Sequence, residues 1–419
     1  MWAPWAVLLC KFNDNDVEPK PRAFYDQLFT SAGVGTMNMV DYFRDNSHGV
    51  VDISGSQVFG WLTIPHARSE YTGSGPNPDG RKQLVQWAKD AAVAAKIDLG
   101  PFFKVCVVMN VSTDLFGGGS GAVCSPDSTV PSLLGQEMGH GFGLRHSRID
   151  GSTADYKDPW DTMSTAAAYE APDPTYSWIG PGLNAANMDD HGWLDGSRVW
   201  NTYGATTQTI QLRPLHRRDL GGWLCARVGP YYLEFRAKDR WDKGIPAPTV
   251  LVHRLENSRS YLMRATSGAA SMGVGDDFER GSKTFTLADW VRVTVDAIDA
   301  GSQTATVTVD YQPADQPPVV GPAELFGGVA NDGGGWIFVN GHIYRVPPRS
   351  PVLVLLEQLG RLQAAVDIEI TADRSVEVER VYRGIAASVS EHLEDPDELH
   401  TPPTDPFDGR LDGFETGQS

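Results

Sequence analysis

The stretch QEMGHGFGLRH, residues 136–146, has the residue types and the spacing of a metal site. Positions four apart on a helix lie on one face, so Gln136 and His140 point to the same place and Glu137 lies beside them. The glycines after His140 favour a helix end and a turn with positive φ, which brings His146 back to that place. The sequence therefore predicts metal ligands at these three positions, with a carboxylate held next to them.

The same stretch resembles the metzincin metallopeptidase motif H-E-x-x-H-x-x-G-x-x-H, with Gln136 in place of the first histidine. The other fixed positions are in register with the motif: Glu137, His140, Gly143 and His146. Further along, DPWDTMS places Met163 in a segment that resembles the metzincin Met-turn, whose methionine forms a hydrophobic floor below the metal. The resemblance implies that Gln136 and the two histidines hold a metal and that Glu137 is the general base. Gly143 and Met163 are implied to support the site.

Four longer stretches are similar to secreted peptidases of the gametolysin and immune inhibitor A type: CKFNDND, DYFRDNSHGVVDISGSQVFGWL, NMDDHGWL and YYLEFRAKDRWDKGIPAPTVLVHRL. The resemblance covers residues 1–200 well and 201–311 loosely, and it does not extend to 320–419. Gametolysin-like proteins are known with Gln in the position of Gln136, which implies that the exchange keeps a metal site and alters its metal preference. Imidazole and oxygen ligands suit zinc, with copper as the alternative.

The site predicts a metal-dependent endopeptidase in which a metal activates water and Glu137 takes the proton of that water. The resemblance implies that SQVFGWLTI, residues 56–64, is an edge strand that pairs with a substrate peptide. The alternative is a catalytically inactive pseudopeptidase that keeps the fold as a scaffold for binding or adhesion. Gln136 discriminates between them, because restoring His there raises metal affinity and turnover only in a working enzyme.

The pattern along the chain predicts an α+β multidomain protein: a metzincin-like α/β catalytic domain, a β-sandwich domain and a small α+β C-terminal module. The predicted segments are a metallopeptidase domain (1–202), a β-sandwich-like domain (203–312), a Pro-rich linker (313–322), a hairpin-helix module (323–390) and an acidic disordered tail (391–419).

Local patterns underlie these boundaries. The first segment alternates buried strands such as AVLLCKF and FKVCVVMNV with amphipathic helices such as RKQLVQWAKDAAVAAKI, and GGGSGAVCSPDSTVP reads as a loop that ends this layer. Beyond residue 203, short β-rich runs follow one another without helices. In the C-terminal module, Asn340-Gly341 predicts a two-residue hairpin loop, Ser350-Pro351 starts a helix, and VDIEITADRSVEVERVY supplies further strand.

Composition excludes several partners. The 35 Lys and Arg against 53 Asp and Glu give a net charge of −18, which repels nucleic acid and anionic lipid surfaces. No segment has the roughly 18–20 uninterrupted apolar residues of a membrane span. A protein or peptide substrate is expected, and the oligomeric state stays open.

The start, MWAPWAVLLCKF, has no basic region and reads as a buried strand rather than a signal peptide, although the family resemblance favours an extracellular protein. The 4 cysteines are too few for a disulfide framework, so they leave the compartment open. Cys10 and Cys106 lie in apolar runs typical of buried thiols, and nothing in the sequence supports a bridge from Cys106 to Cys124.

Other candidate ligands have weaker patterns. His48 and His191 are expected to be turn or surface residues, and either replaces the missing histidine only if the fold brings it close. The run NDND, Asn13 to Asp16, together with Glu18 is a weak calcium candidate without EF-hand spacing, and a solvated turn is the simpler interpretation. The pair Asp276 and Asp277 is likewise a weak candidate for which a solvated turn is the simpler interpretation.

Overall fold

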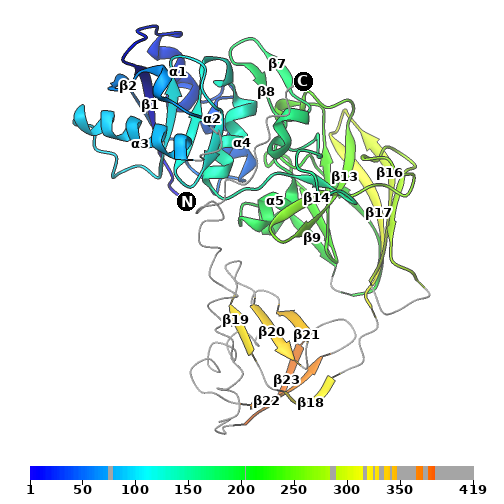
Figure 1. Cartoon of the computed structure of the whole chain (residues 1–419). Helices are drawn as coiled ribbons and strands as arrows, with labels where there is room; N and C mark the ends of the chain where they lie inside the picture. Colours follow the sequence, from blue (N-terminus) through cyan, green and yellow to red (C-terminus); the bar gives the residue numbers. More distant parts are fainter. Residues whose placement is uncertain are drawn as a thin grey trace.

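The computed structural model describes residues 1–73, 79–202, 204–283 and 289–314, together with the backbone of six strands between residues 319 and 382 (Figure 1). The protein is mixed α/β, with several sheets and few helices, which agrees with an α+β multidomain architecture. The short 3₁₀ helices are η1 (Ser31–Gly33), η2 (Arg68–Glu70), η3 (Pro126–Ser128), η4 (Thr162–Ala167), η5 (Gly196–Arg198) and η6 (Arg240–Asp242).

The N-terminal part is built on a five-stranded sheet with the strand order β2-β1-β3-β5-β4. Strands β2, β1, β3 and β5 run parallel to one another, whereas the edge strand β4 runs antiparallel to β5. The strand bounds are β1 (Trp5–Phe12), β2 (Gln57–Ile64), β3 (Lys104–Met109), β4 (Phe116–Gly118) and β5 (Gly121–Cys124). An α/β layer is therefore present where the alternation of strand and helix patterns predicts one.

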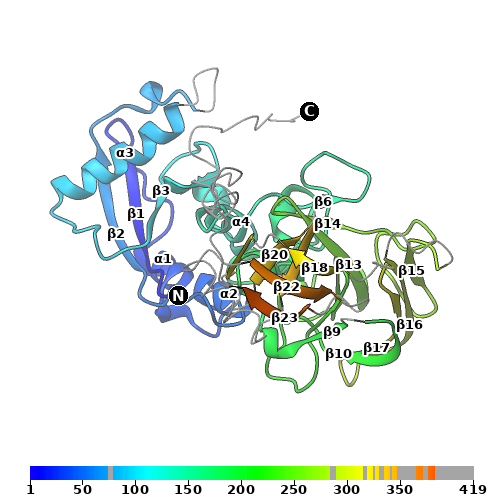
Figure 2. The same ribbon diagram turned by 90° about the horizontal axis from the view of Figure 1, so that it is seen from below.

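Helices cover both faces of this sheet, and the alternation of β1 shows how. Trp5, Val7 and Leu9 pack in the same core as residues of α1, α2 and α4, whereas Leu8 and Cys10 pack with α3 on the other face. Figures 1 and 2 show α3 on its own side of the sheet. The helix bounds are α1 (Arg22–Phe29), α2 (Met39–Asn46), α3 (Asp79–Ala94) and α4 (Pro131–Gly141). Because both faces are buried, β1 is apolar nearly throughout.

The expected loop GGGSGAVCSPDSTVP is instead part of the sheet, because β4 and β5 pair through its glycines. A Cβ at Gly117 would lie 1.9 Å from the backbone oxygen of Glu137, so only glycine lets β4 approach α4 this closely. Ala122, Val123 and Cys124 are fully buried. The prediction of a loop was wrong for β4 and β5 because Gly117 serves close packing, and the turn is confined to Gly119 and Ser120 between the two strands.

The second part is a β-sandwich. A four-stranded sheet, β10-β17-β16-β15, shares one apolar core with a six-stranded sheet, β6-β14-β13-β12-β11-β9. Its strands are β6 (Arg148–Ile149), β9 (Val199–Thr202), β10 (Thr206–Leu212), β11 (Cys225–Val228), β12 (Tyr231–Arg236), β13 (Thr249–Glu256), β14 (Arg259–Leu262), β15 (Asp277–Arg280), β16 (Trp290–Asp299) and β17 (Thr304–Gln312). Both β6 and β9 precede residue 203, so strands from both sides of the predicted 202/203 boundary share the larger sheet.

Between the five-stranded sheet and the sandwich lie the helix α5 (Ala185–Asp190) and the hairpin of β7 (Ala171–Asp173) with β8 (Ser177–Ile179). In the C-terminal region, β18 (Val319–Ala323) pairs with β22 (Ala365–Ile370), which pairs with β23 (Val376–Tyr382). A second sheet holds β19 (Phe326–Val329), β20 (Gly335–Val339) and β21 (His342–Val346).

The C-terminal sheets bear on three sequence predictions. Val339 pairs with His342, which confirms the hairpin around the Asn340-Gly341 step. Strand β18 begins inside the segment 313–322 that reads as a linker, so the end of that segment is strand. The helix predicted from Ser350 and the acidic tail 391–419 lie outside the described residues.

A buried ionic network joins the sandwich to the loop that carries Met163. Arg236 is fully buried, and its guanidinium donates to Asp242 at 2.6 and 2.8 Å and to Glu234 at 2.9 Å. On the neighbouring strand β13, His253 lies 2.8 Å from Asp158, in the loop just before Met163. Leaving one buried charge without its partner typically costs about 3–5 kcal/mol, so this network ties the two parts together strongly.

The imidazole of His253 makes the stability of this network depend on pH. Burial lowers the pKa of His253, but the Glu234 and Asp158 carboxylates outweigh burial and hold that pKa above its usual value. A raised pKa in the folded state means that the stabilisation is fully present below about pH 6.5, the usual pKa of histidine, and is lost as the pH rises through the folded pKa. Burial and the Asp158 charge also raise the pKa of Asp161 to about 7. A carboxyl group with a raised pKa likewise makes the folded protein less stable as the pH rises towards 7.

The His253→Gln variant is therefore expected to lose more stability at acid pH than at mildly alkaline pH. The urea concentration at the midpoint of unfolding is measured at several pH values from acid to mildly alkaline. Plotted against pH, it should fall less steeply for the variant than for the unaltered protein. His66→Gln is the matched control, because His66 lies near the surface beside Glu70. A variant slope equal to that of the unaltered protein would show that His253 does not take up a proton on folding.

Candidate metal centre

The helix α4 and the turn after it position the motif residues. Gln136, Glu137 and His140 lie on α4 and are between 2% and 4% exposed. The helix ends where the backbone N–H of Leu144 donates to the carbonyl of Gly139, and Gly143 takes a φ of 98° that favours glycine. This is the turn that the sequence predicts, and it returns the chain towards the helix.

The turn brings the rings of His140 and His146 together, with their Nε2 atoms 3.0 Å apart. The Nδ1 of His140 lies 2.7 Å from the carbonyl oxygen of Leu144, and the Nδ1 of His146 lies 3.2 Å from a carboxylate oxygen of Asp155. Because both partners only accept hydrogen bonds, each Nδ1 carries a proton, and Nε2 is the nitrogen that each ring turns towards the other.

This arrangement fits a metal ion. Two imidazole nitrogens bound to one tetrahedral zinc lie roughly 3.3 Å apart, close to the distance found here. Burial, followed by the neighbouring His146, lowers the pKa of His140 to about 3, so His140 is neutral as a ligand must be. Hydrogen bonds from the second ring nitrogen to a carbonyl or a carboxylate are the usual support of metal-binding histidines.

Asp155 also organises the charge around His146. Although burial raises the pKa of Asp155, the hydrogen bonds from His146 and Arg148 hold it at about 2. The same carboxylate accepts from Arg148 at 2.7 Å and from Arg259 on β14 at 3.2 Å. A strand of the sandwich therefore takes part in holding the second histidine.

Glu137, three residues before His140 on α4, has a spare acceptor. Its Oε1 accepts a hydrogen bond from the Gln136 amide at 3.3 Å, whereas its buried Oε2 has no hydrogen-bond partner among the described residues. Burial raises the pKa of Glu137 to about 8, against the opposing effects of Gln136 and Arg81. A buried carboxylate with an unused oxygen is suited to exchange a proton with a reacting group.

The side-chain amide of Gln136 has a fixed orientation. The backbone N–H of Thr165, in η4, donates to Oε1 of Gln136 at 3.0 Å. Because a backbone N–H only donates, the atom that faces it is the oxygen, and the NH₂ group is the one that faces Glu137. The predicted ligand Gln136 thus has its oxygen directed to the Met163 segment.

Met163 is fully buried beneath α4, and a Cβ at Gly139 would lie 3.2 Å from its sulfur. Asp161 fixes the tight turn of this segment, since its carboxylate accepts from the backbone N–H of Met163 at 2.6 Å. The backbone oxygen of Met163 accepts from Ser147, directly after His146. Met163 therefore supports the helix segment that carries His140.

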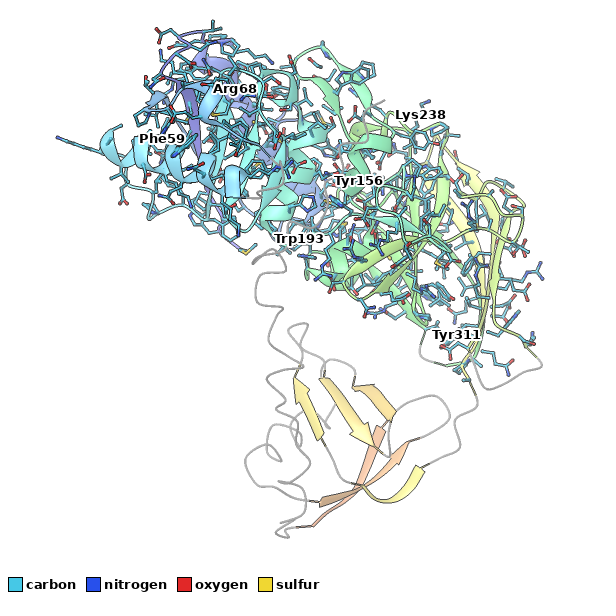
Figure 3. All side chains as sticks on the ribbon, in the orientation of Figure 1. Phe59, Arg68, Tyr156, Trp193, Lys238 and Tyr311 are labelled. Carbon is cyan, nitrogen blue, oxygen red and sulfur yellow. The ribbon has the colours of Figure 1, made fainter. Side chains whose placement is uncertain are left out.

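Sequence reasoning missed Tyr156, whose hydroxyl lies 2.9 Å from Nε2 of His146. The two rings are packed at a centroid distance of 4.1 Å. Figure 3 shows Tyr156 in the region where the α/β layer meets the sandwich. The segment GSTADYKDPW carries no motif that marks this tyrosine, and only its place between His146 and the Met163 segment is a signal.

The weaker candidates do not join this site. The ring of His48 lies against the carbonyl of Leu215 and the N–H of Asp195, whereas His191 contacts the backbone of Asn187 and of Gly143 rather than the two motif histidines. Across the described ranges, no three His, Cys, Asp or Glu side chains form a group that could hold a metal.

The acidic runs make other contacts. Asp16 and Glu18 both pair with Lys11, while Asp14 accepts from the backbone N–H of Arg68. In the second run, Asp276 caps the backbone N–H of Gly273, and Asp277 pairs with Arg292. These carboxylates therefore stabilise local turns and strands.

The strand next to the site differs from the one that the sequence indicates. SQVFGWLTI forms β2, which is an edge strand as predicted, but the edge that contacts α4 is β4 on the opposite side of the sheet. All 4 cysteines, Cys106 and Cys124 included, are buried free thiols. None of the helices in the described ranges has the length and apolar character needed to cross a bilayer.

Comparisons with known proteins add little to the geometry. No family model matches the chain, and no curated protein matches its sequence. Among solved structures, the crystal structure of wild-type OgpA from Akkermansia muciniphila is similar at 10% sequence identity. The match covers 75% of this chain and 92% of that chain with a TM-score of 0.30, which is too low to establish a shared fold.

Proposed function

We propose that the chain is a metal-dependent endopeptidase whose centre is the histidine pair on α4 and the turn after it. The observation that carries the proposal is the convergence of the His140 and His146 Nε2 atoms at 3.0 Å, with both Nδ1 atoms held by acceptors. Two acceptor nitrogens at this distance repel each other unless a proton or a metal cation lies between them, and the proposal takes the metal because each ring already holds a proton at Nδ1. The metzincin-like spacing of the sequence supports the same interpretation.

The roles of the side chains follow from their contacts. His140 and His146 would hold the metal, with zinc as the first candidate and copper as the second. A metal there polarises the scissile carbonyl and makes water a better nucleophile near neutral pH. Glu137 would take a proton from the attacking water through its unpaired oxygen and return it to the leaving amine.

The substrate in this proposal is a peptide in extended form. Strand β4 forms one edge of the sheet, and its Gly117 lies against the backbone of Glu137. A peptide that adds to this edge would pass close to the general base, with main-chain hydrogen bonds giving affinity. The family resemblance adds an extracellular location to the proposal.

A scaffold that binds without cleaving is the second candidate, and burial favours it. Gln136, Glu137 and His140 are each at most 4% exposed, so a substrate reaches them only after side chains move. In that case the fold would serve a binding or adhesion role, and metal would have no effect on peptides.

Removal of the metal separates the two candidates. A chelator is expected to abolish hydrolysis of an unfolded protein substrate, and added zinc or copper ions should restore it, because water is activated only at the occupied site. Release of peptides measured by mass spectrometry gives the readout, with the protein kept in buffer alone as the control. Hydrolysis that resists chelation, or no hydrolysis under any metal condition, contradicts a metallopeptidase.

A further inference from the structure

We propose that Tyr156, rather than Gln136, supplies the third protein ligand of the metal. The inference rests on the proposed metal site but not on its catalytic role. Its starting point is that, in the described ranges, no third His, Cys, Asp or Glu side chain forms with His140 and His146 a group that could hold a metal. A closed or open zinc site needs at least three protein ligands, so an oxygen from another residue type must complete it.

The position of the Tyr156 hydroxyl meets this need. It lies 2.9 Å from Nε2 of His146, which itself lies 3.0 Å from Nε2 of His140. The Nδ1 proton of His146 is held by Asp155, so the hydroxyl approaches the nitrogen that carries the lone pair. The phenol oxygen and the His140 nitrogen thus both lie within 3.0 Å of the same His146 nitrogen.

The backbone of Tyr156 indicates that this position is selected. Its φ is 61°, in the left-handed region that non-glycine residues seldom occupy. Such conformations persist where the surrounding structure demands them and are frequent at functional sites. Packing of its ring on His146 at 4.1 Å then fixes the direction of the hydroxyl.

Gln136 is the competing oxygen, but its Oε1 already accepts a backbone hydrogen bond, and its side chain also hydrogen-bonds Tyr156. Its Oε1 is held by the backbone N–H of Thr165, and its NH₂ faces Glu137. An amide NH₂ is not a metal ligand, so Gln136 would have to break the Thr165 contact and turn over before it could coordinate. In the arrangement seen here Gln136 instead orients Glu137, and the substitution of the motif histidine is compensated by Tyr156. On coordination the phenol releases its proton to solvent, as ligands generally do.

Copper gives a direct readout of this ligand, because a phenolate bound to Cu²⁺ produces a charge-transfer absorption in the visible region. The protein loaded with one equivalent of Cu²⁺ should show this band. Tyr156→Phe should lose it while still binding copper, and its zinc affinity should fall by at least about 10–100-fold, the range for loss of a supporting contact. Tyr261→Phe is the matched control, since its hydroxyl accepts from Arg148 at 3.3 Å in the same network.

The outcomes separate this inference from the proposed function. A band lost in Tyr156→Phe and retained in Tyr261→Phe supports the tyrosine ligand. Copper bound in a His140-dependent manner without such a band, or with a band that survives Tyr156→Phe, overturns the tyrosine ligand and leaves the metallopeptidase intact. Failure to bind copper and zinc at all overturns both. Circular dichroism of each variant confirms that the comparison is made on folded protein.

Discussion

The Glu137→Gln variant is expected to hydrolyse peptides about 10²- to 10⁴-fold more slowly than the unaltered protein, the range that a positioned general base contributes. Gln has nearly the same shape but takes no proton from water. Glu137 is buried, and its Oε2 has no hydrogen-bond partner among the described residues, so the substitution removes the acceptor for the proton without breaking a hydrogen bond to that oxygen.

The variant should keep its metal, because Glu137 is not among the proposed ligands. Initial rates on a fluorogenic peptide, measured with metal content on the same sample, separate loss of chemistry from loss of metal. Glu256→Gln, at an exposed carboxylate on β13, is the control for a general effect of the substitution. Cleavage at the unaltered rate in a metal-loaded Glu137→Gln sample would exclude Glu137 as the base.

The part of the site that depends on nearby residues could be predicted from the sequence. Helical spacing places Glu137 beside His140, and a glycine that tolerates a φ of 98° returns His146 to the same helix. These relations involve at most ten residues of chain, so no tertiary information is needed. The strands and helices of the α/β layer follow in the same way from hydrophobic periodicity.

The rest depends on contacts between distant segments. The orientation of Gln136 is set by Thr165, 29 residues away, and Tyr156 is marked by no motif. Strand β4 was read as a loop because glycine usually signals a turn, whereas Gly117 is required here by the approach of α4. No local pattern contains information of this kind.

The relation between the two large parts of the chain was also beyond local patterns. The two-residue strand β6 and the four-residue strand β9 are too short to stand out by periodicity, yet they complete the larger sheet of the sandwich. Arg259 from that sheet contacts Asp155, which in turn holds His146. The sandwich is thus coupled to the candidate metal centre by charge as well as by packing.

The central claim is that His140 and His146 bind a metal, and elemental analysis of the purified protein beside its His140→Ala variant tests it most directly. We expect about one zinc or copper per chain in the unaltered protein and almost none in the variant, because a single remaining imidazole cannot hold the ion. His66→Ala, at a histidine near the surface, should keep the full amount. No metal in the unaltered protein even after incubation with excess zinc and copper, or equal metal in His140→Ala, would contradict the metal centre.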